Sequence, residues 1–567
     1  MKVRLTAVLA AALLACTPSF AGDKDIYIDL IEEAMAAYTP EQVEKYIGDV
    51  ETYGIWEHGF ARLTAGTGTL VAFGRAPEKK DLLERMMDLC LREMPLAKAK
   101  NYDRRGSVGN DFAVKEIVQC IVDLEEAHVF PKETTDRWRE QVTALEVQST
   151  YSCLPPLKDT RAYNWVVFNC TSECARLWAG MGGDRDHVDR YFLDQLDWFD
   201  GNGMYMDPHQ PILYDFVTRL QFMLALHYGY DGPARAAIEE NLRKSALPTL
   251  WMQSASGEIP FGGRSNQFVY NETAYAAVCE YYAAWFRREG DYELASRFKA
   301  AAGKAVHSLE YWMSQKPVSH VKNRFPAAMG IGCEGYGYFD KYMVTMGSWA
   351  RLAYLFADDS IAPSKKREPG AIFVTSDKFH QVIMNEGGYT VQFDLDAQKE
   401  YDSSGMGRFQ REEAPSVIAL SVPCPGAEKH NYKTDIDYEG PLSISPLWDS
   451  YELVKARRGC VVLSDGNGAL WKCRLSRRGL RMTLSGMEEA RLTLPALIFD
   501  GENSPEVECD GHSLTITFNG WQCIYSTDGV ISDTGLTYCN RNGHLRRFDA
   551  VSRRGRLHVK GRIVPVG

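Results

Sequence analysis

Apolar residues recur with a helical period from Ile26 to about Phe356. Segment 81–92 shows the pattern clearly, with one apolar face opposite a face of charged side chains. The apolar positions of that segment are Leu82, Leu83, Met86, Leu89 and Cys90. Similar segments, separated by Gly, Pro, Asp or Asn, are 111–126, 134–148, 164–179, 187–198, 213–228, 233–251, 273–288, 292–312 and 340–355. With the segments near Ile26 and Trp56 they make about twelve helices in successive hairpins, which predicts an (α/α)6 toroid or barrel.

The pattern changes after a polar linker at 362–370, which has a proline near each end. Short runs of alternating apolar and polar residues follow, with Gly and Asp turns between them. Examples are 371–375, 389–393, 459–463, 513–518 and 556–560. Strands spaced in this way predict an antiparallel β-sandwich. The expected fold is therefore α+β and multidomain, with a toroid at 22–362 and a sandwich at 371–567.

The N-terminal segment 1–21 has the features of a secretory signal. Lys2 and Arg4 precede an apolar run at 5–14, and Ser19-Phe20-Ala21 fits a small-x-small cleavage site. The run is shorter than the roughly 20 residues of a membrane-spanning helix. We therefore expect an exported protein, periplasmic or at the cell surface, with no membrane span. An alternative interpretation takes Leu-Leu-Ala-Cys at 13–16 as a lipobox, which would place a lipid anchor on Cys16.

Composition narrows the classes of partner and cofactor. The net charge of −11 argues against nucleic acid, because phosphate binding requires a basic face. It leaves acidic sugars open, because one local Arg can bind a carboxylate. The fourteen cysteines have no repeated spacing and favour buried apolar positions over disulfides or zinc ligands. The sequence has no Gly-x-Ser-x-Gly, phosphate-binding Gly-rich or His-Glu-x-x-His motif, so we expect no cofactor and no metal.

Two polar, Gly-rich segments interrupt the helical pattern. The first, 200–209, contains Tyr205, Asp207 and His209, which together offer an acid, a base and a hydrogen-bond donor. Asp200 in the same segment is typical of a turn or a helix cap. Tyr214 and Asp215 begin the next helix, where the helix dipole alone would also favour a carboxylate.

The second segment, 258–267, places Arg264 after two glycines and before Asn266. A guanidinium there suits bidentate capture of a carboxylate, although a structural salt bridge to Asp215 or Glu258 is the alternative. Tyr270 and Glu272 follow at the start of a helix, and the carboxylate again has either a chemical role or a structural role at the helix N-terminus.

Aromatic residues beside polar ones mark further candidate sugar contacts. They are Trp56, His58, Asn164, Trp165 and Tyr336, and Glu334 is a candidate acid beside the last of them. Sugar rings stack on aromatic faces through their C–H groups, while their hydroxyls require directional partners. Burial in the core is the alternative for Trp165.

Four motifs together resemble a bacterial family of (α/α) toroid proteins long catalogued as a domain of unknown function. These motifs are Asn164-Trp-Val-Val-Phe168, Asp200-Gly-Asn-Gly-Met-Tyr-Met-Asp207, Tyr214-Asp-Phe216 and Gly263-Arg-Ser265. The resemblance covers about residues 30–356 and implies a carbohydrate-active enzyme. Related toroids include glucuronidase-type glycoside hydrolases and lyases of the heparinase and alginate lyase type, so it also implies a uronic-acid-containing oligo- or polysaccharide as substrate.

Three functions remain open at this stage. A glycoside hydrolase would use two carboxylates from among Asp207, Asp215, Glu272 and Glu334, with Arg264 on the uronate. A polysaccharide lyase would neutralise the uronate with Arg264, Asn266 or Asn271 and remove the C5 proton with Tyr270, Tyr205 or His209. A non-catalytic glycan-binding protein is the third. The density of acids beside Tyr and His favours an enzyme, and the hydrolase is the preferred interpretation.

Overall fold

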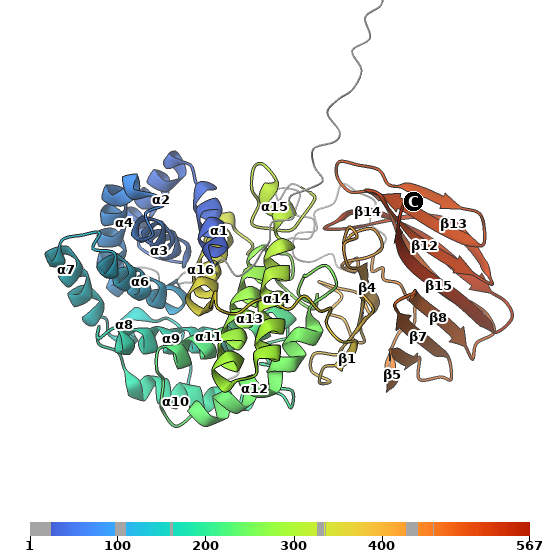
Figure 1. Cartoon of the computed structure of the whole chain (residues 1–567), viewed down its shortest axis with the longest axis horizontal. Coiled ribbons are helices and arrows are strands. Elements are labelled where there is room, and N and C mark those ends of the chain that lie inside the picture. The colour runs from blue at the N-terminus through green and yellow to red at the C-terminus, as the bar shows by residue number, and fades with distance from the viewer. Residues whose placement is uncertain are drawn as a thin grey trace, which may run out of the picture.

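Helices make up the N-terminal part of the chain and antiparallel sheets the C-terminal part, as Figure 1 shows. The computed structural model describes residues 24–96, 109–158, 163–325, 334, 336–426, 440–457 and 459–567. The predicted order of helices followed by antiparallel strands is confirmed. The predicted signal segment and Cys16 lie outside the described residues. No helix in the described part of the chain is long and apolar enough to span a membrane.

Six helices contact one another in a closed ring. They are α3 (Gly59–Ala72), α6 (Gly109–Glu126), α9 (Tyr163–Trp178), α11 (Ile212–His227), α13 (Tyr270–Glu289) and α16 (Phe339–Phe356). Each contacts the next in this order, and α16 contacts α3, which closes the ring. Almost every position of α13 is buried, as expected for a helix enclosed on all sides.

A second set of helices packs against the outside of this ring. They are α1 (Asp25–Ala36), α4 (Lys80–Glu93), α7 (Lys132–Thr143), α10 (Arg185–Gln195), α12 (Arg235–Met252) and α14 (Tyr292–His307). Helix α4 buries Leu83, Met86, Leu89 and Cys90, so the apolar stripe read from the sequence is the face that contacts the ring. Shorter or peripheral helices are α2 (Pro40–Tyr53), α8 (Val147–Thr150) and α15 (Glu310–Ser314).

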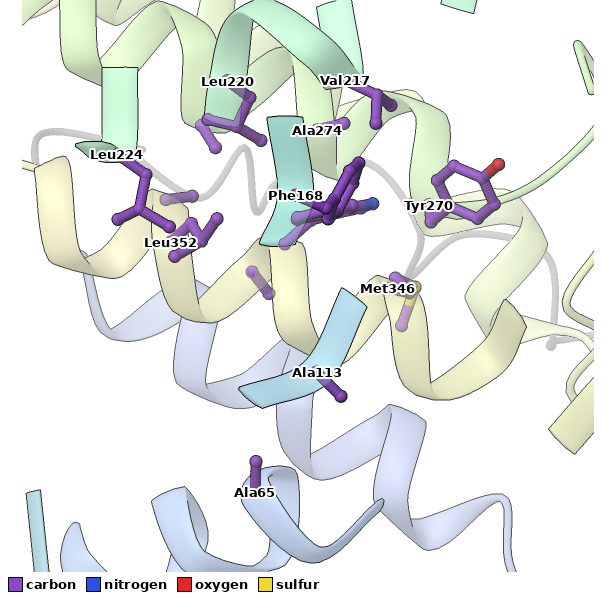
Figure 2. Packing of buried hydrophobic residues seen from close by; sticks show 14 of the residues in the cluster. Ala65, Ala113, Phe168, Val217, Leu220, Leu224, Tyr270, Ala274, Met346 and Leu352 are labelled. Carbon is purple, nitrogen blue, oxygen red and sulfur yellow. The ribbon is translucent and has the colours of Figure 1, made fainter. Parts of the chain in front are cut away.

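Side chains from all six ring helices fill the centre. Figure 2 shows Leu220 and Leu224 of α11 near Leu352 of α16, with Tyr270 of α13 toward one end. Small residues such as Ala113 and Ala274 are fully buried among them, which lets neighbouring helices approach closely. The centre of the ring is therefore packed along most of its length.

Three antiparallel sheets follow the helices. One contains β1 (Ala371–Val374), β2 (Gln381–Glu386), β3 (Tyr389–Asp394) and β4 (Gly405–Arg411) in that order. The largest has the order β10 (Glu506–Cys509), β11 (Ser513–Phe518), β12 (Trp521–Thr527), β15 (Arg556–Pro565), β8 (Gly479–Ser485), β7 (Leu470–Ser476), β6 (Cys460–Ser464) and β5 (Glu452–Ala456). The third is β13 (Val530–Asn540), β14 (Gly543–Ser552) and β9 (Ala490–Phe499).

The sheets have a hydrophobic core of their own, distinct from that of the helices. Strand β7 shows how the sequence builds it, because Trp471, Cys473 and Leu475 alternate with exposed neighbours and all three are buried. The described cysteines are all free thiols, and Cys509 is the exposed one among them. The stacking of these sheets as a sandwich and the division at 362 and 371 stay predictions.

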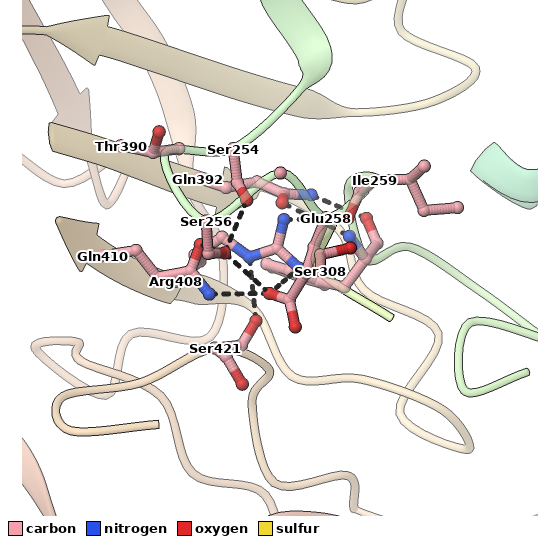
Figure 3. Close-up of polar contacts among 12 residues, drawn as sticks. Ser254, Ser256, Glu258, Ile259, Ser308, Thr390, Gln392, Arg408, Gln410 and Ser421 are labelled. Carbon is pink, nitrogen blue, oxygen red and sulfur yellow. Dashed lines mark hydrogen bonds and ion pairs between the residues drawn. The ribbon is translucent and has the colours of Figure 1, made fainter. Parts of the chain in front are cut away.

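The loop between α12 and α13 is held against the first sheet by a buried polar cluster (Figure 3). Arg408 of β4 donates from Nη1 to the Ile259 carbonyl at 2.9 Å, and Gln410 donates to the Glu258 carboxylate at 2.8 Å. Burial lowers the pKa of Arg408 to about 10, although the Glu258 charge opposes this shift. These contacts fix the second polar loop from the side of the sheets.

Candidate functional site

A cavity of about 360 Å³ lies at one end of the helix ring. Its lining residues are His58, Arg62, Phe112, Asn164, Trp165, Phe168, Asp207, Pro208, Tyr214, Val217, Arg264, Tyr270, Tyr336, Lys341, Tyr342, Thr345 and Trp349. Every ring helix contributes to the lining, mostly from its first two turns. The six helix N-termini therefore surround one space, and their dipoles favour an anion there.

The two polar loops read from the sequence meet at this cavity through Asp207 and Arg264. Arg264 donates from Nη2 to Asp207 Oδ2 at 2.5 Å and from Nη1 to the Pro208 carbonyl at 2.5 Å. Its guanidinium also lies over the Tyr214 ring, 4.6 Å from the centroid. Arg264 thus pairs with Asp207, and not with Asp215 or Glu258, which were the partners considered from the sequence.

Among the described residues, Asp207 is the one carboxylate in the cavity lining, and it is only 2% exposed. Its Oδ1 accepts the backbone N–H of Asn164 at 3.2 Å, at the start of α9. Burial raises the pKa of Asp207 to about 6, and the Arg264 charge offsets only part of this shift. At neutral pH the carboxylate is therefore ionised, and it takes up a proton under mildly acidic conditions.

Gly203 shows why the first loop requires glycine. Its φ is 73°, and a Cβ there would lie 2.1 Å from the Asn241 carbonyl oxygen on α12. Asp200 accepts the N–H groups of Asn202 and Met204, both at 2.9 Å, so it acts as a turn residue. The loop is thus closely packed against α12 while it presents Asp207 to the cavity.

Three hydroxyl groups are connected beside Arg264. Ser265 Oγ lies 2.5 Å from the Tyr336 hydroxyl and 3.3 Å from the Tyr214 hydroxyl. Both tyrosines line the cavity, whereas Ser265 is fully buried behind them. The wall at this point therefore consists of phenol rings whose hydroxyls are held in place from behind.

Glu334 lies directly behind this wall. Its Oε1 accepts the backbone N–H of Ser265 at 2.6 Å, and its Oε2 accepts the side-chain amide of Gln267. Burial raises the pKa of Glu334 to about 7, despite these two hydrogen bonds. Burial and then the Glu334 charge raise the pKa of Tyr336. Glu334 thus carries a proton in a large fraction of molecules near neutral pH.

Several other residues predicted from the sequence line the same cavity. They are His58, Asn164, Trp165, Tyr270 and Tyr336. Trp165 is 40% exposed, which agrees with a contact surface and not with the core interpretation. Tyr270 stacks on Phe268, with ring centroids 5.2 Å apart. The structure thus gathers these residues around Asp207 and Arg264.

Two predicted acids lie outside the cavity, within ion pairs. Asp215 is fully buried and accepts from Arg219 at 2.6 and 2.8 Å, and its Oδ1 also accepts the N–H of Tyr205. Glu272 is fully buried and accepts from Lys322 at 2.6 Å. Both carboxylates therefore lie in buried ion pairs away from the cavity lining.

Four other predicted residues also lie away from the cavity lining. Tyr205 is fully buried, with its hydroxyl donating to Gln195. His209 is exposed, and its carbonyl accepts from Gln398. Asn266 accepts from Arg541 at 2.6 and 2.9 Å, which ties the second loop to the sheets. Trp56 lines a neighbouring cavity of about 380 Å³.

Sequence reasoning missed four prominent lining residues, Arg62, Lys341, Tyr342 and Trp349. Arg62 and Lys341 belong to helices that are nearly 280 residues apart in sequence, so their proximity depends on closure of the ring. One signal was available, because Arg62 is a charged residue within an otherwise apolar helix from Gly59 to Ala72. Among the described residues, no group of three His, Cys, Asp or Glu side chains could hold a metal ion.

No family model and no curated protein sequence matches the chain. Among solved structures, a chondroitinase AC lyase has a TM-score of 0.45 at 9% identity, with 95% of this chain and 83% of that chain covered. A heparinase III structure has a TM-score of 0.31 at 8% identity, with 86% of this chain and 78% of that chain covered. A GH127 β-L-arabinofuranosidase from Geobacillus stearothermophilus T6 has a TM-score of 0.36 at 11% identity, with 96% of this chain and 98% of that chain covered. Similarities this weak carry no inference about substrate or reaction.

Proposed function

We propose that the protein is a carbohydrate-active enzyme, a glycoside hydrolase that binds an acidic sugar in the cavity of an (α/α)6 toroid. The charge of the lining carries the proposal, because the described lining residues include three cations, Arg62, Arg264 and Lys341, and one carboxylate, Asp207. Six helix N-termini add to this positive potential. A uronic acid end of an oligo- or polysaccharide has the charge that such a site favours. Export through the N-terminal segment is part of the same proposal.

The aromatic lining supports a sugar over other anions. Trp165, Tyr270, Tyr342 and Trp349 supply ring faces in a cavity whose lining also holds Asn164. Ring faces contact the C–H surface of a sugar, and amide, phenol and imidazole groups bind its hydroxyls. A small inorganic anion would not contact most of these aromatic rings.

The hydrolytic roles are assigned to Asp207 and Glu334. Asp207 activates the attacking water, because each of its oxygens has a lone pair beyond the one already bonded. Glu334 does not line the cavity, so its proton would reach the leaving oxygen through the hydroxyls of Ser265 and Tyr336 in front of it. Its pKa of about 7 keeps it protonated at mildly acidic pH. Their raised pKa values suit a base and an acid working over the same pH range.

A lyase is the second candidate, and the tyrosine hydroxyls favour it. Tyr214, Tyr270, Tyr336 and Tyr342 all line the cavity, so a phenol group could take the C5 proton of a uronate. Nearby cations would neutralise the carboxylate and stabilise the developing charge. We rank it second because Asp207, the one lining acid, has no role in that reaction.

A substrate panel tests the proposed class. Glucuronides and matched neutral glucosides are incubated with the protein, and released sugar is measured by chromatography. We expect release from the glucuronides and little from the glucosides. Equal release from both would contradict an acidic-sugar site. Binding without any product, both from glucuronides and from an oligosaccharide whose uronate is linked through O4, would indicate the non-catalytic glycan-binding protein.

The pH dependence of kcat/KM follows from the two raised pKa values. The rate should rise as pH increases through about 6, because Asp207 must lose its proton to act as the base. It should fall as pH increases through about 7, because Glu334 must keep its proton to act as the acid. A pH series on a glucuronide measures both limbs. In Glu334→Gln the alkaline limb should disappear; an unchanged alkaline limb would remove Glu334 from the mechanism.

Asp402 lies between β3 and β4 of the first sheet and is expected to position the loop that contains Arg264. Its Oδ2 accepts the N–H of Gly263 at 2.6 Å, next to Arg264. In Asp402→Ala we expect turnover to fall by about 10- to 100-fold, because small displacements of substrate-binding groups are costly. Exposed Asp396, whose side chain has no bond to this loop, gives the matched control Asp396→Ala. Equal turnover in the two variants would show that the sheet does not position the loop.

A further inference from the structure

We infer that the carboxylate of the acidic sugar is held by Arg62 and Lys341, on the side of the cavity formed by α3 and α16, and not by Arg264. This inference rests on the proposed function and specifies how the site recognises its substrate class. It assigns a specificity role to two residues that no sequence motif indicated.

Arg264 already uses two of its nitrogens in hydrogen bonds within the protein. Its Nη2 donates to Asp207 and its Nη1 to the Pro208 carbonyl, while Tyr214 covers one face of the guanidinium. Binding a substrate carboxylate through these two nitrogens would require it to release Asp207. Arg264 is therefore better suited to holding Asp207 in place than to capturing a uronate.

Arg62 has a donor that is still open. Its Nε donates to Glu116 at 2.9 and 3.1 Å, and its Nη1 donates to Thr345 at 2.7 Å. Its Nη2 has no hydrogen-bond partner and is buried, although Arg62 lines the cavity and is only 2% exposed. A buried, unpaired guanidinium N–H is costly, and an anionic ligand oxygen in the cavity would satisfy it.

The guanidinium of Arg62 is also fixed in orientation. Glu116 and Thr345 hold two of its nitrogens, and its central carbon lies 5.2 Å from the Trp349 ring centroid. A preorganised donor loses little conformational entropy when it binds a ligand. The open nitrogen therefore presents a defined direction to the sugar.

Lys341 adds a second charge on the same side. It lines the cavity from the first turn of α16, and among the described residues no carboxylate forms an ion pair with its ammonium. Burial lowers its pKa, and nearby Arg62 lowers it further, while Glu57 opposes these effects. An anion bound between the two cations would relieve their mutual repulsion.

His58 completes this side of the cavity. It is 4% exposed, and its Nδ1 is buried without a hydrogen-bond partner. Burial and the Arg62 charge hold the pKa of His58 well below its usual range, so the ring is neutral. A neutral imidazole nitrogen is suited to a sugar hydroxyl next to the carboxylate. Arg62 Nη2 and His58 Nδ1 are thus two unpaired buried polar atoms on residues that line this side of the cavity.

Binding measurements separate this inference from the proposed function. Isothermal titration compares glucuronate, glucose and glucose 6-sulfate on the wild-type protein, Arg62→Gln and Lys341→Gln. Arg75→Gln, which replaces a half-exposed arginine just beyond the far end of α3, is the matched control. We expect wild type and control to prefer glucuronate to glucose by at least 10-fold, and each cavity variant to lose about 10-fold of that preference.

Each contrary outcome has one meaning. If wild type prefers glucuronate and both cavity variants keep that preference, the subsite is overturned while the proposed function stands. If Arg264→Gln alone removes the preference, Arg264 is the clamp and the inference fails. Tighter binding of the sulfated sugar than of glucuronate would overturn the assignment to a carboxylate.

If the wild-type protein binds neither acidic sugar more tightly than glucose, the proposed substrate class itself fails. Lys341→Gln keeps the test decisive if Arg62→Gln does not fold, because Lys341 has no ion pair to lose.

Discussion

Replacing Asp207 by Asn is expected to lower kcat on a glucuronide by about 1,000-fold while the protein stays folded. Asp207 is the one acid among the described lining residues, and Asn keeps its size but removes the base. The Asn164 N–H can still donate to the amide oxygen, which limits structural change. Steady-state kinetics with the purified variant, together with circular dichroism, measure the effect.

Asp197→Asn is the matched control for this variant. Asp197 is exposed and lies ten residues earlier in the chain, outside the cavity lining. Its replacement should leave kcat unchanged. A wild-type rate in Asp207→Asn would exclude Asp207 as the base and would favour a tyrosine-based elimination.

Replacing Asp215 by Asn is expected to lower the free energy of unfolding by about 3 to 5 kcal/mol, since it leaves the buried charge of Arg219 without a counterion. Both side chains are fully buried, and two hydrogen bonds connect them. Arg219 also donates to Thr249 and Tyr282, so the loss would disturb the packing between α11, α12 and α13. Urea unfolding followed by circular dichroism measures the change.

Glu239→Gln provides the comparison for Asp215→Asn. It breaks the exposed i,i+4 ion pair with Arg235 on α12, and such pairs contribute little to stability. Its unfolding midpoint should match that of the wild-type protein. If Asp215→Asn were equally stable but inactive, Asp215 would belong to the catalytic machinery and its assignment to the scaffold would be wrong.

The helix and strand classes could be predicted because they depend on local patterns. The stripe of Leu83, Met86 and Leu89 faces the ring in α4, and the alternation around Trp471 gives β7 its buried face. The closing contact between α16 and α3 could not be predicted in this way, because it joins segments about 280 residues apart.

The site was predictable where its residues come from loops with a distinctive composition. The Gly-rich loops supplied Asp207 and Arg264 as candidates, and both line the cavity. Asp215 was ambiguous, although Arg219 at i+4 already suggested a helical ion pair. The partner of Glu272, Lys322, is 50 residues away and gave no sequence signal.

Arg62 and Lys341 illustrate the limit of sequence patterns for this cavity. Arg62 is the one charged residue of α3, Lys341 follows Asp340 in the first turn of α16, and neither belongs to a recognisable motif. Whether these two residues can bind a ligand depends on which of their groups remain unpaired after folding, such as Nη2 of Arg62. Only the folded arrangement gives that information.

The mass balance of the products tests the central claim most directly. An oligosaccharide that has one glucuronate at its non-reducing end and a second glucuronate linked through both C1 and O4 is treated with the protein, and the products are weighed by mass spectrometry and identified by NMR. We predict saturated glucuronic acid and a second sugar whose masses sum to the substrate plus one water. Products that sum to the substrate alone, one of them an unsaturated uronate, would contradict hydrolysis and establish elimination.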